Sequence, residues 1–313
     1  MLAYLRVLAG GRPLGGSERY RPFFIVGSGR SGTTLLRAML EAHPVVHIPP
    51  EAYVLGKVAR EYRRYSRLPW NVLLRIVLGA FEYDARWETF NLTLGSLFRE
   101  LQSRPPGARD LAAVLDALYR AHARRHKPSA TRWGDKNPHH SFYLPVLREM
   151  FPDLQVIHIL RDGRDVVRSY MRMQSMQSGL AHFAAHWLHA VRSVQRFGAR
   201  YPHQYLELRY EDLVREPRAM MEAVAAFLHL DFDDRMLRHH ALDLRLGDVE
   251  RYPHLTGVRE PVYQTSIGRW RSEFDAAQIA ELERLLGSTL AVLGYGDAGH
   301  GIATGATPRG LDR

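Results

Sequence analysis

The stretch IVGSGRSGTTLL at residues 25–36 places glycines at the spacing of a phosphate-binding loop. Gly27 and Gly32 fit the Walker A pattern G-x-x-x-x-G-K-[ST], but Thr33 stands at the position of its lysine. Together with Gly29, these glycines allow positive φ angles and let backbone N–H groups approach an anion closely. We therefore predict an anion-binding loop that lacks the lysine of nucleotide-binding P-loops.

The side chains of this loop supply further donors for an anion. Arg30 offers a guanidinium that can bind two phosphate oxygens, and Thr33 and Thr34 offer hydroxyl groups at the start of a helix. The plain alternative is a glycine turn that only leads the chain into the helix. The mixture of residue types favours binding, so the candidate ligands are Arg30, Ser31, Gly32, Thr33 and Thr34.

A second candidate site follows the apolar run LQVIHIL at residues 154–160. Arg161 lies where this predicted strand meets a helix, and Ser169 lies two helical turns further on. An arginine at a strand end and a serine on the following helix can bind one phosphate together. Arg168 and Arg172 share a helix face at i, i+4 spacing, and for them we favour a solvated stripe without a ligand.

Lys136 belongs to a third polar cluster, RWGDKNPHH. The Gly-Asp-Lys-Asn-Pro run predicts a tight turn at the surface rim, and an ordinary surface lysine is the plain alternative. His139 and His140 follow it, but no H-x₃-H spacing or obvious carboxylate partner accompanies them, so we expect no metal site.

These groups need a scaffold, and apolar strands alternate with helical patterns along the chain. Such alternation predicts an α/β fold: a P-loop-like three-layer domain with a central parallel sheet and a helical insert. Ligands of parallel sheets bind at the carboxyl ends of the strands, which brings the loop at residue 27 and Arg161 to one rim. The predicted strands are 21–27, 154–160 and 205–213, and the predicted helices are 33–43, 110–126, 220–230 and 276–295.

The domain organisation follows from composition. We expect a flexible leader at 1–20, one domain at 21–295 with a helical acceptor-binding insert at 52–130, and a disordered tail at 296–313. The sequence has no run of 18 or more apolar residues, so we expect no membrane-spanning helix.

The net charge and the absence of cysteine limit the classes of ligand and of catalysis that the chain can have. The net charge of +10 indicates an anionic ligand, but the arginines are dispersed rather than clustered, which argues against nucleic acid. The chain has no cysteine, which excludes disulfides and thiolate catalysis within it and fits a cytoplasmic location. A homodimer is left open.

Taken together, the motifs resemble the sulfotransferases that use 3′-phosphoadenosine 5′-phosphosulfate (PAPS). The run RSGTTLLRAMLEAHP is closest to the tyrosylprotein sulfotransferases, whose loops read R-S-G-T-T-L-x-R-A-M-L-x-A-H-P. The resemblance implies that the loop from Arg30 to Thr34 holds the 5′-phosphosulfate and that Arg161 and Ser169 hold the 3′-phosphate. It covers residues 22–51, 154–170, 206–212 and 261–271.

The same resemblance implies the catalytic residues. Glu51, in HIPPEAY, matches the catalytic glutamate, although Pro50 replaces the first glutamate of the family's G-E-E-T motif. Lys136 matches the lysine that stabilises the bridging oxygen as the sulfuryl group leaves, and Arg30 is the third expected catalytic residue, because it can stabilise the leaving phosphate. A glutamate that only begins a helix is the alternative for Glu51, and His43 and His47 are rival bases, with His43 expected to be structural.

Two further positions match less closely. Tyr210 corresponds to a tyrosine near the adenine, and Arg269 precedes Trp270 where the tyrosylprotein enzymes have a cofactor-contacting lysine. Met173 stands where those enzymes place another cofactor-binding arginine, and the sequence leaves open whether Arg172 compensates.

The predicted function is transfer of a sulfuryl group from PAPS, as co-substrate and without a metal, to a hydroxyl, with release of PAP. The acceptor is open among tyrosyl peptide, carbohydrate, lipid and small metabolite. Two alternatives remain: a small-molecule kinase with an altered P-loop, which would bind ATP with Mg²⁺, and a non-catalytic binder of nucleotides or polyanions.

Overall fold

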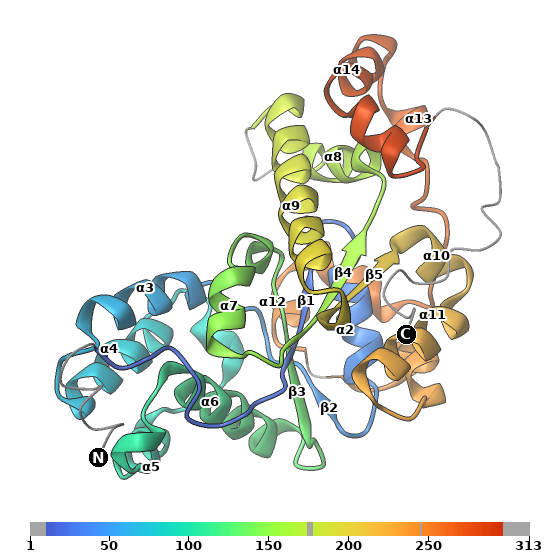
Figure 1. Ribbon diagram of the computed structural model, residues 1–313. Helices are drawn as coiled ribbons and strands as arrows, with labels where there is room; N and C mark the ends of the chain where they lie inside the picture. The colour runs from blue at the N-terminus through green and yellow to red at the C-terminus, as the bar shows by residue number, and fades with distance from the viewer. Residues whose placement is uncertain (1–10, 174–177, 245, 297–313) are drawn as a thin grey trace.

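The centre of the protein is a five-stranded parallel sheet (Figure 1). The computed structural model describes residues 11–173, 178–244 and 246–296. The sheet order is β2-β3-β1-β4-β5, and each adjacent pair is parallel. The strands are β1 (Phe23–Val26), β2 (Val46–His47), β3 (Arg132–Lys136), β4 (Gln155–Leu160) and β5 (Tyr205–Arg209).

Alternation along the central strand β1 creates two cores. Phe24 and Val26 belong to one hydrophobic cluster, whereas Phe23 and Ile25 belong to another. Since successive side chains of a strand point to opposite faces, the sheet is covered on both sides. This arrangement confirms the predicted three-layer α/β fold with a parallel sheet.

Helices from the middle of the chain cover the first face, where Figure 1 shows them gathered beside the sheet. They belong largely to the predicted insert, whose role in acceptor binding stays a prediction. These elements are α3 (Leu55–Tyr65), α4 (Trp70–Glu82), 3₁₀ segments η1 (Trp87–Phe90) and η2 (Pro106–Ala108), α5 (Gly95–Gln102), α6 (Leu111–His126) and α7 (Leu144–Met150).

The second face is covered by α2 together with helices from the C-terminal part of the chain. These are α2 (Thr33–Glu41), α10 (Tyr210–Arg215), α11 (Pro217–Leu228) and η5 (Asp234–Ala241). A third cluster joins α8 (Gly163–Met171), α9 (Leu180–Arg200) and α14 (Ala276–Val292). The remaining short elements are η3 (Pro138–Phe142), η4 (Pro202–Gln204), α12 (Asp248–Arg251), η6 (Pro253–Arg259) and α13 (Trp270–Glu273).

Two strands differ from the sequence expectation. The run containing Lys136 is not a surface turn: it forms β3, and the side chains of Asp135 and Lys136 are buried. A polar strand can be buried because its groups find partners: Asp135 accepts one hydrogen bond from Tyr119 and contacts His140. The predicted strand 205–213 ends at Arg209, where α10 begins.

Residues 11–20 are not the flexible leader that composition suggests. Leu14 is buried in the first core, and its carbonyl accepts a hydrogen bond from the Ala112 backbone N–H. Arg12 donates to the carbonyls of Ser66 and Leu68 at 2.7 and 2.6 Å. Residues 1–10 and the predicted tail from 297 lie outside the described part of the chain.

No helix in the part of the chain that the structure describes is both long and apolar enough to cross a membrane.

Candidate active site

The glycine loop joins β1 to α2 and takes three residues into positive φ. These are Gly27 (φ 145°), Arg30 (φ 68°) and Gly32 (φ 97°), with Gly32 immediately before the first turn of α2. Gly29 does not use positive φ, contrary to the expectation. It is small for a different reason, because a Cβ there would overlap the hydroxyl of Tyr170.

Arg30 connects this loop to the second predicted site. Its Nε donates to Ser169 Oγ at 3.1 Å, and its carbonyl accepts from Arg161 Nη1 at 3.0 Å. Burial lowers the pKa of Arg30, and the nearby Arg161 charge acts in the same direction. The two guanidinium groups therefore concentrate positive charge at the carboxyl ends of β1 and β4, as an anion-binding site requires.

Arg161 is held in place from three sides. Its Nη2 donates to the Ser266 carbonyl at 2.7 Å, and its guanidinium carbon lies 4.3 Å from the centroid of the Tyr210 ring. The Tyr210 hydroxyl is 2.6 Å from Ser266 Oγ. The Nε of Arg161 is buried and has no hydrogen-bond partner among the described residues. A buried N–H of this kind is available to an anionic ligand.

One cavity of about 580 Å³ brings most of the predicted binding residues together. Its lining includes Arg30, Gly32, Thr33, Thr34, Arg161, Ser169, Tyr210 and Arg269. Ser31 is different: its side chain is buried outside this lining, and its backbone N–H donates to the Ser28 carbonyl at 3.3 Å.

The arginines of α8 separate into two environments. Arg168 is buried, lines the cavity and pairs with Glu273 at 2.7 and 2.5 Å, so the expected solvated position is wrong for it. Arg172 has 64% of its side chain exposed, pairs with the same Glu273 at 3.3 Å and is not part of the cavity lining. Nothing in its position indicates that Arg172 replaces the arginine missing at Met173.

The proposed catalytic pair lies in direct contact. Lys136 Nζ, at the carboxyl end of β3, donates to Glu51 Oε1 and also to Thr34 Oγ1 at 3.2 Å. The Lys136 side chain is 0% exposed and that of Glu51 is 14% exposed. Through Thr34, this pair borders the cavity that holds the loop and Arg161.

Two residues beside Glu51 were not found from the sequence. The Tyr53 hydroxyl donates to Glu51 Oε2, and Arg86 Nη1 lies 3.9 Å from the same oxygen. The Arg86 guanidinium stacks 3.7 Å from the Tyr53 ring centroid. Burial, followed by the Glu51 charge, raises the pKa of Tyr53. The i+2 spacing from Glu51 could have signalled Tyr53, whereas Arg86 is brought there only by the fold.

The rival histidines have other partners. His43 Nε2 lies 2.9 Å from the Asp231 carbonyl, as a structural role requires. His47 lies between Glu41, at 3.0 Å, and His122, at 2.7 Å. Both histidines thus have structural partners, whereas Glu51 contacts Lys136, which also contacts Thr34 of the loop.

In the described part of the chain, no group of three or more His, Asp or Glu side chains is placed to hold a metal ion.

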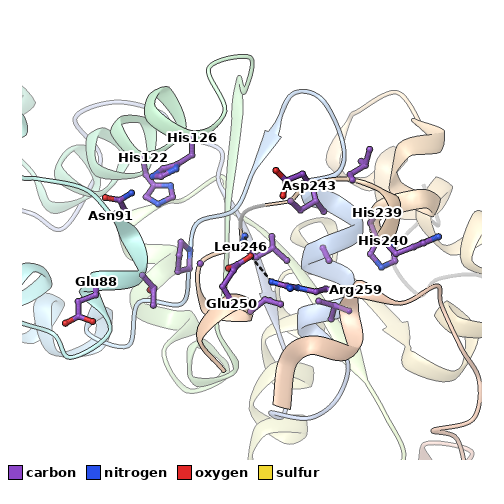
Figure 2. A pocket seen from close by; sticks show the side chains of 18 residues that line it. Glu88, Asn91, His122, His126, His239, His240, Asp243, Leu246, Glu250 and Arg259 are labelled. Carbon is purple, nitrogen blue, oxygen red and sulfur yellow. Dashed lines mark hydrogen bonds and ion pairs between the residues drawn. The ribbon is translucent and has the colours of Figure 1, made fainter. Parts of the chain in front are cut away.

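A second cavity, of about 610 Å³, is bordered by α6, η1, η5 and the segment that leads through α12 (Figure 2). Its polar lining includes four histidines, His122, His126, His239 and His240, and the carboxylates Glu88, Asp243 and Glu250. Pro50, the neighbour of Glu51, also lines it. The predicted PAPS-binding residues line the other cavity.

Comparison with known proteins matches this geometry to one family. A family model described as "Sulfotransferase family" matches residues 22–234. "Protein-tyrosine sulfotransferase A" of Caenorhabditis elegans is 27% identical over 90% of this chain and 69% of its own length. An uncharacterised Aquifex aeolicus protein is 26% identical, over 82% of this chain and 31% of that one. A "putative protein-tyrosine sulfotransferase" of Caenorhabditis briggsae is 24% identical, over 87% of this chain and 88% of that one.

Solved structures share the fold. The sulfotransferase domain of the Synechococcus PCC 7002 olefin synthase superposes with a TM-score of 0.61 at 24% identity, covering 86% of this chain and 95% of that domain. The sulfotransferase domain of the curacin biosynthetic pathway gives a TM-score of 0.58 at 19% identity, covering 87% of this chain and 98% of that domain.

Proposed function

The chain belongs to the sulfotransferase family, an enzyme family that transfers sulfuryl groups, and from this premise we propose that its donor is PAPS and its acceptor a hydroxyl group, with PAP as the second product. The observation that carries the proposal is the buried Arg161, whose Nε–H has no hydrogen-bond partner among the described residues and which shares a cavity with Arg30 and Ser169. The ribose of PAPS carries a 3′-phosphate and a 5′-phosphosulfate, which suit two separate cationic groups.

The donor would be bound by residues that follow β1 and by residues that follow β4. Arg30, Thr33 and Thr34, with the N–H groups at the start of α2, would bind the 5′-phosphosulfate. Arg161 and Ser169 would bind the 3′-phosphate, and this requires Ser169 Oγ to serve the phosphate as well as Arg30. Tyr210 would pack beside the adenine, and Arg269, which is exposed at the cavity rim, would reach a phosphate.

In the reaction, the acceptor oxygen forms a bond to sulfur while the bond from sulfur to the bridging oxygen of PAPS breaks. Glu51 accepts the proton of the acceptor hydroxyl. The electron pair of the broken bond stays on the 5′-phosphate of PAP, where Lys136 donates a hydrogen bond to the bridging oxygen. The contact of Lys136 with both Glu51 and Thr34 supports this division of tasks, because one ammonium group touches both the proposed base and the donor loop.

For the acceptor we propose a tyrosyl side chain in a peptide. The support is the name that several relatives carry, protein-tyrosine sulfotransferase. Tyr53 and Arg86, which border Glu51, come from the segment predicted to bind the acceptor. Carbohydrate, lipid and small-metabolite hydroxyls are the competing outcomes. The cytoplasmic location and the homodimer stay predictions.

A transfer assay tests the donor and the acceptor together. The protein is incubated with [³⁵S]PAPS and a panel that holds a tyrosyl peptide, a phenylalanine version of that peptide, a glycan, a lipid alcohol and small phenols. We expect label on the tyrosyl peptide and none on the phenylalanine version. Label on another hydroxyl would overturn the acceptor and keep the donor, whereas no label on any hydroxyl would contradict the PAPS reaction.

The role of Glu51 is tested by Glu51→Gln, which keeps the shape and removes the base. Turnover should fall by a factor of about 10² to 10⁴, the contribution of general-base catalysis. PAP affinity should stay within about twofold of wild type, because Glu51 does not line the donor cavity. Glu82→Gln, an exposed position on α4, is the matched control and should change neither quantity. Unchanged turnover in Glu51→Gln would remove Glu51 from this role.

A further inference from the structure

Arg37 ties three parts of the active site together. It lies on α2, one turn past Thr34, and is 1% exposed. Its Nε and Nη2 donate to the Ile48 carbonyl at 3.2 and 3.0 Å, and Nη2 also donates to the Leu246 carbonyl at 2.9 Å. Its Nη1 donates to Asp248 Oδ1 at 2.5 Å. Arg37 therefore fixes both the chain that leads to Glu51 and the segment that carries Asp248.

Asp248 faces Lys136 with its other oxygen. The residue is 4% exposed, its Oδ2 lies 3.8 Å from Lys136 Nζ, and this oxygen has no hydrogen-bond partner in the described chain. Burial alone would raise the pKa of Asp248, but the Arg37 and Lys136 charges outweigh it and lower the pKa. Asp248 is thus a buried anion beside the proposed catalytic lysine.

The segment that carries Asp248 separates the second cavity from Lys136. Leu246, Gly247, Val249 and Glu250 line the second cavity, and Figure 2 shows Leu246 and Glu250 there. Asp248 does not line that cavity and turns inward to Arg37 and Lys136 instead. Its carboxylate therefore contacts Arg37 and Lys136 and not the second cavity.

We propose that Asp248 is a positioning residue for Lys136 during sulfuryl transfer, an inference that rests on the proposed function. Before transfer, two carboxylates attract the buried ammonium: Glu51, in contact, and Asp248, at 3.8 Å. When Glu51 takes the acceptor proton it becomes neutral. A buried ammonium without an anionic partner is unfavourable. Asp248, held ionised by Arg37, keeps Lys136 charged and directed at the bridging oxygen.

A double-mutant cycle tests this role. Asp248→Asn keeps an oxygen for Arg37 and removes the charge that faces Lys136. We expect kcat to fall about 10- to 100-fold, the usual effect of small misplacement at a reacting centre. PAP affinity should stay within about twofold, since Asp248 is outside the donor cavity. In a Lys136→Met background the same substitution should change kcat by less than about twofold, because Asp248 acts only through Lys136.

Asp116→Asn is the matched control. Asp116 is as buried as Asp248, at 5% exposed, and accepts from Arg120 and Trp133 at 2.8 Å each. It should leave kcat within about twofold in both backgrounds. A kcat loss in Asp248→Asn that is equally large in the Lys136→Met background, or absent in both, overturns the proposal.

The assay is transfer of ³⁵S from PAPS to the panel acceptor that wild type labels fastest. If Asp248→Asn does not fold, Asp248→Glu enters the same cycle, because it keeps an anion for Arg37 but moves the carboxylate relative to Lys136. A loss of kcat that appears when Lys136 is present and disappears in the Lys136→Met background supports the proposal. An unchanged kcat, or equal losses in both backgrounds, overturns it. Failure of wild type to label any acceptor would instead be failure of the proposed function.

Discussion

Gly32 is a position of the donor loop where an added side chain meets both backbone strain and a clash. It has φ 97° and ψ 11° directly before α2. A Cβ there would overlap the ring of Tyr210, with Cε2 at 2.9 Å, and would also come within 3.3 Å of Ile159 Cδ1. The ring has little room to move, because Ser266 lies at its hydroxyl and Arg161 over its face.

Gly32→Ala should therefore lower the free energy of unfolding through two effects. Placing an L-residue at this left-handed backbone costs about 1–2 kcal/mol. Forcing a methyl group against the Tyr210 ring adds about 1–3 kcal/mol, the usual range for overpacking. The expected loss is about 2–5 kcal/mol in all. PAP affinity should fall as well, because the clash shifts the first N–H groups of α2 and the ring beside the adenine.

Urea denaturation with and without saturating PAP measures the stability loss, and calorimetry measures the affinity. Gly107→Ala is the control: a Cβ there meets no atom within 4 Å and its φ is not in the left-handed region, so stability should change by at most about 0.5 kcal/mol. A loss below about 1 kcal/mol for Gly32→Ala, with PAP affinity intact, would show that the loop accepts a side chain at this position.

Three further predictions concern the donor site, the response to acid and a helix. Arg161→Lys should weaken PAP binding about 10- to 100-fold in calorimetry, because an ammonium cannot replace charge-assisted hydrogen bonds in the guanidinium geometry; a dissociation constant within about twofold of wild type would exclude Arg161 as a ligand. Burial opposes ionisation of Glu207, but hydrogen bonds from His158 and Tyr205 lower its pKa to about 2. A carboxylate with a lower pKa in the folded state stabilises the protein above its ordinary pKa, near 4.5, and loses that contribution as the pH falls towards 2. Glu207→Gln should therefore remove up to about 3 kcal/mol of the difference in unfolding free energy between pH 5 and pH 2. An unfolding free energy that depends on pH as in wild type would contradict this role of Glu207. Gly79→Ala, inside α4 with open space around the added Cβ, should raise stability by about 0.5–1 kcal/mol in urea melts, and destabilisation would contradict the helix geometry.

Local sequence predicted the parts of the site where apolar strands end in glycine or charge. The loop before α2 and Arg161 after β4 both follow buried runs, so their meeting at one sheet edge follows from parallel topology. One expectation about the loop was wrong: Gly29 is needed for the space that Tyr170 occupies, not for a positive φ. The Ser31 side chain does not belong to the cavity lining, and its binding role stays a prediction.

Groups whose partners are remote in the chain could not be predicted. The polar strand β3 has the composition of a turn, and its burial is explained only by Tyr119, Glu51 and Thr34. Asp248 gives no signal in the sequence, because its role depends on an arginine more than two hundred positions earlier. The spacing of apolar residues along the sequence predicts which helices and strands form, whereas the pairing of buried charges depends on how those elements pack.

Calorimetric titration of the wild-type protein shows whether PAPS is the donor. PAP and Mg·ATP are titrated separately at the same pH and salt concentration. We expect saturable, one-to-one binding of PAP and much weaker binding of Mg·ATP, because Arg161 and Ser169 would bind the 3′-phosphate that ATP lacks. Tighter binding of Mg·ATP than of PAP would exclude PAPS as the donor and would favour a kinase.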